Sequence, residues 1–291
     1  MMRLGLIGYP LSHSLSPVIH MAALQSCGLE GSYSLFPIHP DDKQGLKDLL
    51  GRVRSGEIQG LNVTVPHKQN VIEFLDELTP TANTIGAVNT IYMKDHKLIG
   101  DNTDAPGFLT DLKRFLSTEI QRNGSSHALV LGAGGSARAV VYALVSDGWN
   151  VYLAARRLEQ AEQLAAALAN YPFRISAYSL STMEANLHAT RLISNLSLIV
   201  NTTPVGMTPN FDESPWPESF PFPPHAAIYD LVYNPRETRL VREARAQGRP
   251  ATTGLGMLIE QAALAFETWT GHRPSRENMQ AVVKQSSVSS L

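Results

Sequence analysis

Short apolar runs alternate with amphipathic stretches through the first hundred residues of the chain. The pattern predicts strands over residues 4–9, 33–38 and 60–65 and helices over residues 17–29, 42–53 and 68–78. Pro17 suits the first helical position, and Ser16 before it is expected to cap the first helix. Strands and helices in alternation favour a mostly parallel sheet that is covered on both faces.

A hairpin is expected at the end of this stretch, because apolar residues 87–93 and 97–100 flank the polar turn Lys-Asp-His at 94–96. It would give the sheet an antiparallel member. A helix over residues 106–115 then leads to a polar, glycine-containing segment, residues 118–126, that we expect to form a surface loop.

A second alternation begins near residue 128. It predicts strands over residues 128–131, 151–155, 198–201 and 228–232 and helices over residues 136–146, 159–170 and 258–269. Within the helix from Ser136, Ala137, Val140, Val141 and Leu144 recur at helical spacing, as in a helix packed on a sheet. Residues 209–224, rich in proline and aromatics, are expected to form a surface loop, and the last dozen residues to be loosely ordered.

Length and composition indicate a two-domain enzyme that acts on small molecules. A chain of 291 residues with 43% apolar side chains can fill two cores. The net charge of −2 argues against non-specific nucleic-acid binding, which needs a basic surface. Cys27 is the only cysteine, so an intramolecular disulfide and a cysteine metal cluster are excluded, and a buried structural thiol is expected.

The chain begins with a strand pattern at residues 3–8 rather than with a charged leader and a long apolar stretch. No apolar run approaches the roughly 20 residues that a bilayer span needs. We therefore expect a cytoplasmic protein without membrane partners.

A glycine-rich run between a predicted strand and a predicted helix fits the G-x-G-x-x-G/A fingerprint of dinucleotide binding. It consists of Gly132, Ala133, Gly134, Gly135, Ser136 and Ala137. Glycines allow a tight turn close to the pyrophosphate, and amides at the helix start meet its negative charge. The alternative is a turn where a strand simply meets a helix, but the strand-turn-helix context favours the cofactor.

The next predicted strand of this half is followed by Arg156 and Arg157. A NAD site usually presents an acidic side chain there, whereas guanidinium groups suit the charge and geometry of a 2′-phosphate. A solvated helix start is the other interpretation, but arginine is unfavourable at that end of a helix dipole. We therefore predict NADP, with NAD as a weaker alternative and no metal.

A lone lysine and a lone carboxylate stand in runs of neutral hydrogen-bonding residues at 61–68 and 100–104. Hydride addition to a ketone leaves negative charge on oxygen, which the ammonium of Lys68 could stabilise and protonate. Asp104 could hold that lysine by a charge-assisted hydrogen bond. Isolated Lys and Asp residues are mostly solvated, but these flanking patterns favour a proton relay in a ketone reductase. His13 and His67 are interpreted as structural.

Ser14 and Ser16 place hydroxyls at a strand-to-helix junction, where carboxylates can accept hydrogen bonds. A helix cap would explain Ser16 but not Ser14. Together with the runs above, these residues make the chain resemble the shikimate dehydrogenase family over nearly its whole length. The resemblance rests on runs in the family's order at residues 8–17, 60–68, 86–90, 100–104, 132–135, 201–207 and 254–258, with Gln261 after them.

The resemblance implies roles for individual residues. Ser14 and Ser16 would hold the substrate carboxylate, and Lys68 with Asp104 would form the catalytic pair. The residues that would bind the substrate ring are Asn62, Thr64, Asn89, Gln261 and Tyr233. Cofactor contacts would also come from Thr202, Leu231, Gly254 and Met257.

The implied fold is α/β, with an N-terminal substrate domain whose sheet is mostly parallel, a Rossmann-type NADP-binding domain and an active site in the cleft between them. The substrate domain would span residues 1–105, completed by helices in 256–291, and the Rossmann domain residues 106–255. One departure lies at residues 155–157, where the family commonly has Asn-Arg-Thr and this chain has Ala-Arg-Arg. Related quinate/shikimate enzymes that use NAD tend to carry an acidic residue just after the arginines, and Glu159 stands slightly late for that role.

The implied activity is reversible reduction of 3-dehydroshikimate to shikimate by NADPH, in aromatic amino-acid (chorismate) biosynthesis. A quinate/shikimate dehydrogenase with relaxed cofactor use is the nearest alternative. A non-catalytic ligand sensor is a third, against which the intact Lys68 and Asp104 count. The protein is expected to be a monomer or a homodimer.

Overall fold

The computed structural model describes residues 1–119, 126–171, 174–182, 195–218 and 220–286, and its chain divides into two compact units. Unit 1 comprises residues 1–107 together with residues 258–291, and unit 2 comprises residues 108–257. The chain therefore leaves unit 1 inside one helix and returns to it inside another. These helices are α5 (Asp104–Glu119) and α11 (Leu255–Thr270).

Unit 1 is built on a six-stranded sheet of order β2-β1-β3-β5-β6-β4. Its strands are β1 (Met2–Gly8), β2 (Gly31–Pro37), β3 (Gly60–Val63), β4 (Glu77–Leu78), β5 (Thr90–Lys94) and β6 (Lys97–Asp101). The helices of its N-terminal part are α1 (Ser16–Ser26), α2 (Lys43–Arg54), α3 (His67–Asn70) and α4 (Pro80–Ile85), with a 3-10 turn at Val71–Phe74. Parallel pairs join β1 to β2 and β3, while β5 runs antiparallel to β3 and β6, which confirms the hairpin.

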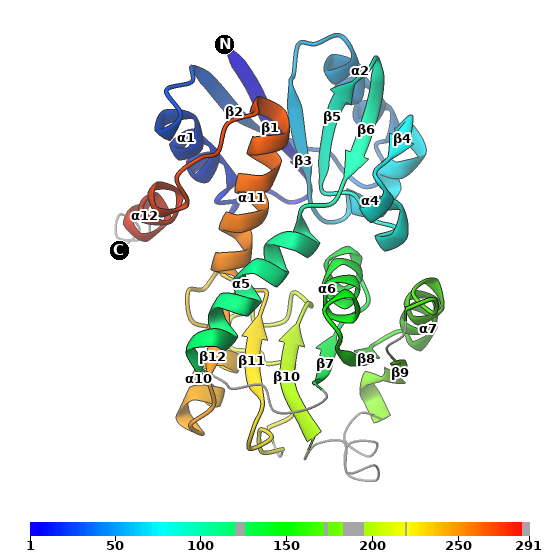
Figure 1. Ribbon diagram of the computed structural model, residues 1–291, viewed down its shortest axis with the longest axis vertical. Helices are drawn as coiled ribbons and strands as arrows, with labels where there is room; N and C mark the ends of the chain where they lie inside the picture. Colours follow the sequence, from blue (N-terminus) through cyan, green and yellow to red (C-terminus); the bar gives the residue numbers. More distant parts are fainter. Residues whose placement is uncertain (120–125, 172–173, 183–194, 219, 287–291) are drawn as a thin grey trace. The chain divides into compact units, whose positions relative to one another are not determined.

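Helices cover both faces of this sheet (Figure 1). One face carries Ile7, Leu61 and Ile91, which cluster with leucines of α2 and with Ala82 of α4. On the other face Tyr33 stacks against His20 of α1, and Trp269 of α11 packs against Gly60. This second face carries the polar site described below. The last described element is α12 (Arg276–Ser286), which lies beside α1. The expectation of loosely ordered final residues was therefore wrong as far as Ser286, and residues 287–291 lie outside the described part of the chain.

Unit 2 contains a fully parallel sheet of order β12-β11-β10-β7-β8-β9. Its strands are β7 (His127–Leu131), β8 (Asn150–Ala155), β9 (Ile175–Ser179), β10 (Leu196–Asn201), β11 (Ala227–Asp230) and β12 (Ala251–Thr253). The helices of its own in the described residues are α6 (Gly135–Ser146), α7 (Leu158–Ala167) and α10 (Arg239–Ala246), with a 3-10 turn at Leu180–Thr182. In chain order this is the 3-2-1-4-5-6 arrangement of a Rossmann fold, as predicted.

Two further expectations about local structure were wrong. The segment 68–78 is not one helix, because a single α turn and a 3-10 turn are followed by β4, which pairs with β6. The proline-rich segment 209–224 is not only a surface loop, since Trp216, Phe220 and Phe222 are buried in the core of unit 2. The indole of Trp216 satisfies its polar group by donating to the carbonyl of Phe220 at 2.9 Å. The predicted loop at 118–126 lies largely outside the described residues.

Candidate active site

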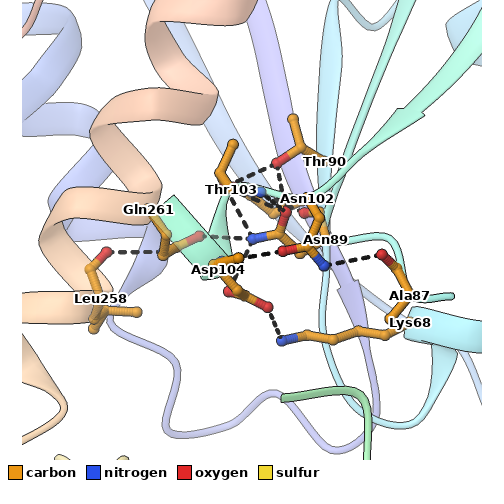
Figure 2. A network of polar contacts seen from close by, with 11 residues as sticks. Lys68, Ala87, Asn89, Thr90, Asn102, Thr103, Asp104, Leu258 and Gln261 are labelled. Atoms are coloured by element: carbon orange, nitrogen blue, oxygen red, sulfur yellow. Dashed lines mark hydrogen bonds and ion pairs between the residues drawn. The ribbon is translucent and has the colours of Figure 1, made fainter. Parts of the chain in front are cut away.

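A buried ion pair lies at the centre of the polar face of unit 1. The ammonium Nζ of Lys68 donates to Oδ2 of Asp104 at 2.6 Å, and the residues are only 8% and 4% exposed. Lys68 lies in the short helix α3, and Asp104 opens α5, where the helix dipole favours a carboxylate (Figure 2). Both predicted catalytic groups are therefore brought together within one unit, out of bulk water.

His67, next to Lys68, has a structural environment. It is buried, and its Nε2 lies 2.7 Å from the carbonyl oxygen of Ile38. This contact ties the start of α3 to the segment that follows β2. His13 is exposed.

Asn89 links the ion pair to the surrounding polar residues. Its Nδ2 lies 2.9 Å from Oδ1 of Asp104, 2.9 Å from Oγ1 of Thr103 and 3.3 Å from Oε1 of Gln261. Its Oδ1 accepts from the backbone amide of Thr103 at 2.7 Å and from the hydroxyl of Thr90 at 3.0 Å. An amide nitrogen carries two hydrogens, so the three acceptors around Nδ2 share them. The network joins β5, α5 and α11 (Figure 2).

Asn62 extends this network along β3. Its Nδ2 donates to the backbone carbonyl of Asn89 at 3.2 Å, and its Oδ1 accepts from the hydroxyl of Tyr33 at 2.8 Å. Thr64, just beyond the end of β3, is half-buried. Residues two apart on a strand share a face, so Asn62 and Thr64 are set for the same side of the sheet.

The hydrogen bonds of the two serines at the start of α1 differ from the expected helix cap. The helix begins at Ser16, and the Oγ of Ser14 accepts from the backbone amide of Ser16 at 3.2 Å. The prediction that Ser16 caps α1 was therefore wrong, because it is Ser14 that binds a free amide of the first turn. Ser16 is buried, and its side chain has a hydrogen bond with Tyr33.

The glycine-rich loop of unit 2 has the expected strand-turn-helix form. β7 ends at Leu131, and α6 begins at Gly135 with Gly134 at its cap position. Gly132 has φ of 108°, a conformation that favours glycine, and a Cβ there would lie 2.6 Å from Oγ1 of Thr202. Around Gly134 the space is open. This is a backbone cradle of the kind that pyrophosphate needs.

The other predicted cofactor residues in unit 2 follow the carboxyl ends of its parallel strands. Arg156 and Arg157 come directly after β8 and are exposed, whereas Ala137 in α6 and Met257 in the first turn of α11 are buried. Thr202 follows β10, and its hydroxyl donates to the carbonyl of Leu131 at 2.6 Å. Because neighbouring parallel strands end at the same sheet edge, Arg156, Arg157 and Thr202 lie at the edge that carries the loop.

Leu231 and Gly254 belong to the same edge, after β11 and β12. They approach closely enough that a Cβ on Gly254 would overlap the carbonyl oxygen of Leu231. Tyr233 also follows β11 in unit 2 and is half-buried. Its contact with substrate stays a prediction.

Asp230, which the sequence did not single out, is a buried acid at the end of β11. It accepts hydrogen bonds from the side chains of Asn201 and Thr238 at 2.9 and 2.6 Å and from the amide of Val232 at 3.0 Å. Burial raises its pKa from 3.8 to about 6, and these hydrogen bonds act in the opposite direction. Asp230 therefore couples the stability of unit 2 to pH.

Sequence reasoning also missed Thr90, Asn102, Thr103 and Tyr33. Asn102 donates to the carbonyl of Ala87 at 2.9 Å and accepts from the amide of Ala105 at 3.2 Å, and so positions the start of α5. Thr90, Asn102 and Thr103 stand in the polar runs already noted, and that position was the available signal. Tyr33 had no such signal beyond its place in a strand.

Across the described ranges, no three His, Cys, Asp or Glu side chains are grouped so as to hold a metal ion. Among those same residues no helix is long and apolar enough to cross a membrane.

Comparisons with known proteins agree with the motifs. A family model described as the shikimate dehydrogenase substrate binding domain matches residues 6–91, and one described as the shikimate 5'-dehydrogenase C-terminal domain matches residues 254–284. A shikimate dehydrogenase (NADP(+)) of Desulforamulus reducens is 42% identical over 273 residues, which are 92% of this chain and 89% of the relative.

Solved structures give the same result. The shikimate 5-dehydrogenase of Thermus thermophilus, in complex with NADP(H) and shikimate, is 39% identical, with a TM-score of 0.82 over 98% of this chain and 99% of that one. A quinate dehydrogenase of Corynebacterium glutamicum, in complex with NAD, is 31% identical, with a TM-score of 0.84 over 98% of this chain and 99% of the other.

Proposed function

Because this chain belongs to the shikimate dehydrogenase family, we propose that it catalyses the reversible, NADPH-dependent reduction of 3-dehydroshikimate to shikimate in aromatic amino-acid biosynthesis. The observation that carries the proposal is the buried Lys68–Asp104 pair within a polar network, in a chain that also has a dinucleotide loop.

Lys68 is the proposed acid and base. When bound, NADPH supplies the hydride that reduces the ketone. The ammonium of Lys68 stabilises the negative charge that develops on the carbonyl oxygen and gives it a proton; in the oxidation of shikimate the neutral amine takes that proton back. Asp104 holds the lysine through their 2.6 Å contact, and the 2.9 Å contact with Asn89 holds Asp104 in turn.

The other polar residues of unit 1 are proposed to bind the substrate. Ser14 and Ser16 would give hydrogen bonds to its carboxylate, and Asn62, Thr64, Asn89 and Gln261 would bind its ring hydroxyls. Tyr233 of unit 2 is proposed as a further contact. Support comes from the hydrogen bonds that already connect Asn62, Asn89 and Gln261.

Unit 2 is the proposed NADP-binding domain, and unit 1 the proposed substrate domain. The positive φ of Gly132 and the open space at Gly134 fit a bound pyrophosphate. Gly135, Ser136 and Ala137 of α6, with Ala133 before it, would supply the rest of that cradle. Leu231, Gly254, Met257 and Thr202 would line the remainder of the cofactor site.

NADP is favoured over NAD because Arg156 and Arg157 follow β8, the second Rossmann strand. Side chains at that position contact the adenosine ribose of the cofactor. Guanidinium groups can form paired hydrogen bonds to a 2′-phosphate. The similarity to a quinate dehydrogenase with bound NAD supports the quinate/shikimate dehydrogenase as the alternative.

A spectrophotometric assay tests both interpretations. Initial rates with shikimate and with quinate, each with NADP and with NAD, should be highest for shikimate with NADP. Comparable rates with quinate and NAD would favour the quinate/shikimate alternative. Binding of shikimate without turnover under any cofactor would favour a sensor.

The compartment and the assembly are proposals from the sequence. We propose a cytoplasmic enzyme, since the chain has a single cysteine and so cannot use the intramolecular disulfides common in secreted proteins. A monomer and a homodimer are both compatible with the proposed chemistry, and sizing by light scattering distinguishes them.

A further inference from the structure

Tyr33 connects residues at both ends of the proposed substrate site without belonging to the catalytic pair. Its side chain is buried, its hydroxyl donates to Oδ1 of Asn62 at 2.8 Å, and it has a hydrogen bond with Ser16. Burial raises the pKa of Tyr33 well above its usual range, so the hydroxyl keeps its proton and stays a donor. His20 stacks on the ring with centroids 4.3 Å apart and an interplanar angle of 4°.

The Asn62 amide is the group that this hydroxyl controls. The two ends of an amide are alike in shape but opposite in hydrogen bonding, so a turn of the group exchanges a donor for an acceptor. Here Oδ1 accepts from Tyr33, and Nδ2 donates to the carbonyl of Asn89 at 3.2 Å. These contacts select one orientation, and the imidazole of His20 is a further neighbour of the amide. Nδ2 carries a second hydrogen besides the one that it gives to Asn89.

We propose that Tyr33 is a positioning residue for substrate binding, whose hydroxyl fixes the Asn62 amide so that its Nδ2 donates to a hydroxyl oxygen of the substrate ring. The inference rests on the proposed function, because it takes that ring to be shikimate's. Tyr33 acts through Asn62 and does not itself touch the substrate.

Ser16 is less dependent on Tyr33. Since the hydroxyl of Tyr33 gives its hydrogen to Asn62, the Ser16 hydroxyl is the donor in their contact. An ionised carboxylate is a stronger acceptor than a phenol oxygen, so the Ser16 hydrogen can turn to a bound carboxylate. The loss of the Tyr33 hydroxyl should therefore affect the ring-hydroxyl end of the substrate and leave the carboxylate end nearly unchanged.

Tyr33→Phe tests the proposal, because it removes the hydroxyl and keeps the ring that His20 stacks on. Without this donor the Oδ1 of Asn62 loses its 2.8 Å hydrogen bond, and the amide keeps only the contacts with His20 and with the carbonyl of Asn89, which hold its orientation less firmly. We expect the KM for shikimate to rise about 10-fold, with kcat within about threefold of wild type and the KM for NADP unchanged.

A double-mutant cycle with Asn62→Ala separates positioning from a general structural effect. If Tyr33 acts through Asn62, then Tyr33→Phe should change the shikimate KM by less than about twofold once Asn62 is alanine. An equal rise in KM in both backgrounds would overturn the proposal, as would a KM that stays within about twofold of wild type in Tyr33→Phe alone.

Asn62→Asp tests the other end of the same side chain, the Nδ2 donor. The test does not depend on whether Tyr33→Phe folds well. The substitution keeps an acceptor for Tyr33 and removes the Nδ2 donor, so it should also raise the shikimate KM by about 10-fold. An unchanged KM would contradict the donor role of Asn62 and with it the role of Tyr33.

Tyr92→Phe is the matched control, since Tyr92 is a half-buried tyrosine on β5 of the same unit. It should leave the KM for shikimate within about twofold of wild type. The wild-type enzyme reports separately on the proposed function: no turnover of shikimate there would refute the function itself, whereas active wild type with an unaffected Tyr33→Phe would refute only this inference.

Discussion

Replacing Lys68 with methionine removes the ammonium and keeps a side chain of similar length. In the folded protein that ammonium lies 2.6 Å from Oδ2 of Asp104, and the two side chains are 11% and 6% exposed. We expect turnover of shikimate to fall by about 10²-fold or more, the usual worth of a positioned acid or base. Binding of shikimate should be largely kept, because the substitution leaves Asn62, Asn89 and Gln261 in place.

The same substitution should also lower stability. It leaves Asp104 a buried carboxylate that keeps Asn89 as a donor at 2.9 Å but has lost the lysine. Breaking a buried ion pair from one side costs about 3–5 kcal/mol. Adding Asp104→Asn removes the uncompensated charge, so the double variant should regain most of this free energy of unfolding while turnover stays low.

The assay follows the absorbance of reduced nicotinamide, with urea unfolding for stability and calorimetry for shikimate binding. Lys97→Met is the control, because Lys97 is an exposed lysine paired with Glu77 at 2.9 Å; its turnover should equal that of wild type. A folded Lys68→Met enzyme that keeps more than about a tenth of wild-type turnover would refute the role of lysine as the acid and base.

Three further variants test unit 2, the last of them with a control at Gly51 of unit 1. Changing Arg156 and Arg157 together to alanine should raise the KM for NADP by about 10-fold or more and that for NAD much less, and equal losses would contradict the phosphate assignment. Asp230→Asn tests the raised pKa of Asp230. Because the pKa is raised in the folded protein, the protonated carboxyl stabilises the fold. This stabilisation is complete below about pH 3.8 and is lost as the pH rises through about 6. Relative to wild type, the variant should therefore gain about 2 kcal/mol in free energy of unfolding between about pH 4.5 and pH 7.5, and a difference that does not vary with pH would exclude the effect. Gly254→Ala should destabilise the protein by about 1–3 kcal/mol, because its Cβ would overlap the backbone of Leu231, whereas Gly51→Ala, in open space on α2, should be stabilising. Thermal unfolding distinguishes the two, and similar midpoints for both would contradict this account.

The α/β fold could be predicted because apolar runs that alternate with amphipathic stretches mark the buried strands, and the Rossmann domain because the glycine-rich run and the family resemblance imply it. The short elements could not. β4 and β12 contain only Glu77–Leu78 and Ala251–Thr253, and each exists because a neighbouring strand offers a partner. Apolar residues after Lys68 are typical of a helix, yet the pairing of β4 with β6 ends it. In α12, Met279 and Val283 are buried at helical spacing, a weak signal within a polar sequence.

The residue types of the candidate site could be predicted better than the hydrogen bonds between them. Lys68 and Asp104 stand out as lone charges in neutral runs, and the fold brings them into contact. That Ser14 rather than Ser16 binds a free amide of the helix start was not predictable, because either serine could do so. Tyr33 reaches Asn62 from a strand two positions away in the sheet, a contact that only the strand order creates.

The discontinuity of unit 1 has a consequence for the order in which the protein is made. A ribosome completes all six strands of this sheet well before it adds α11, which brings Gln261 to Asn89 and Trp269 to Gly60. Unit 2, by contrast, is a single uninterrupted stretch of chain. The nascent protein can therefore close its Rossmann sheet before Gln261 of α11 is available to complete the polar network around Lys68.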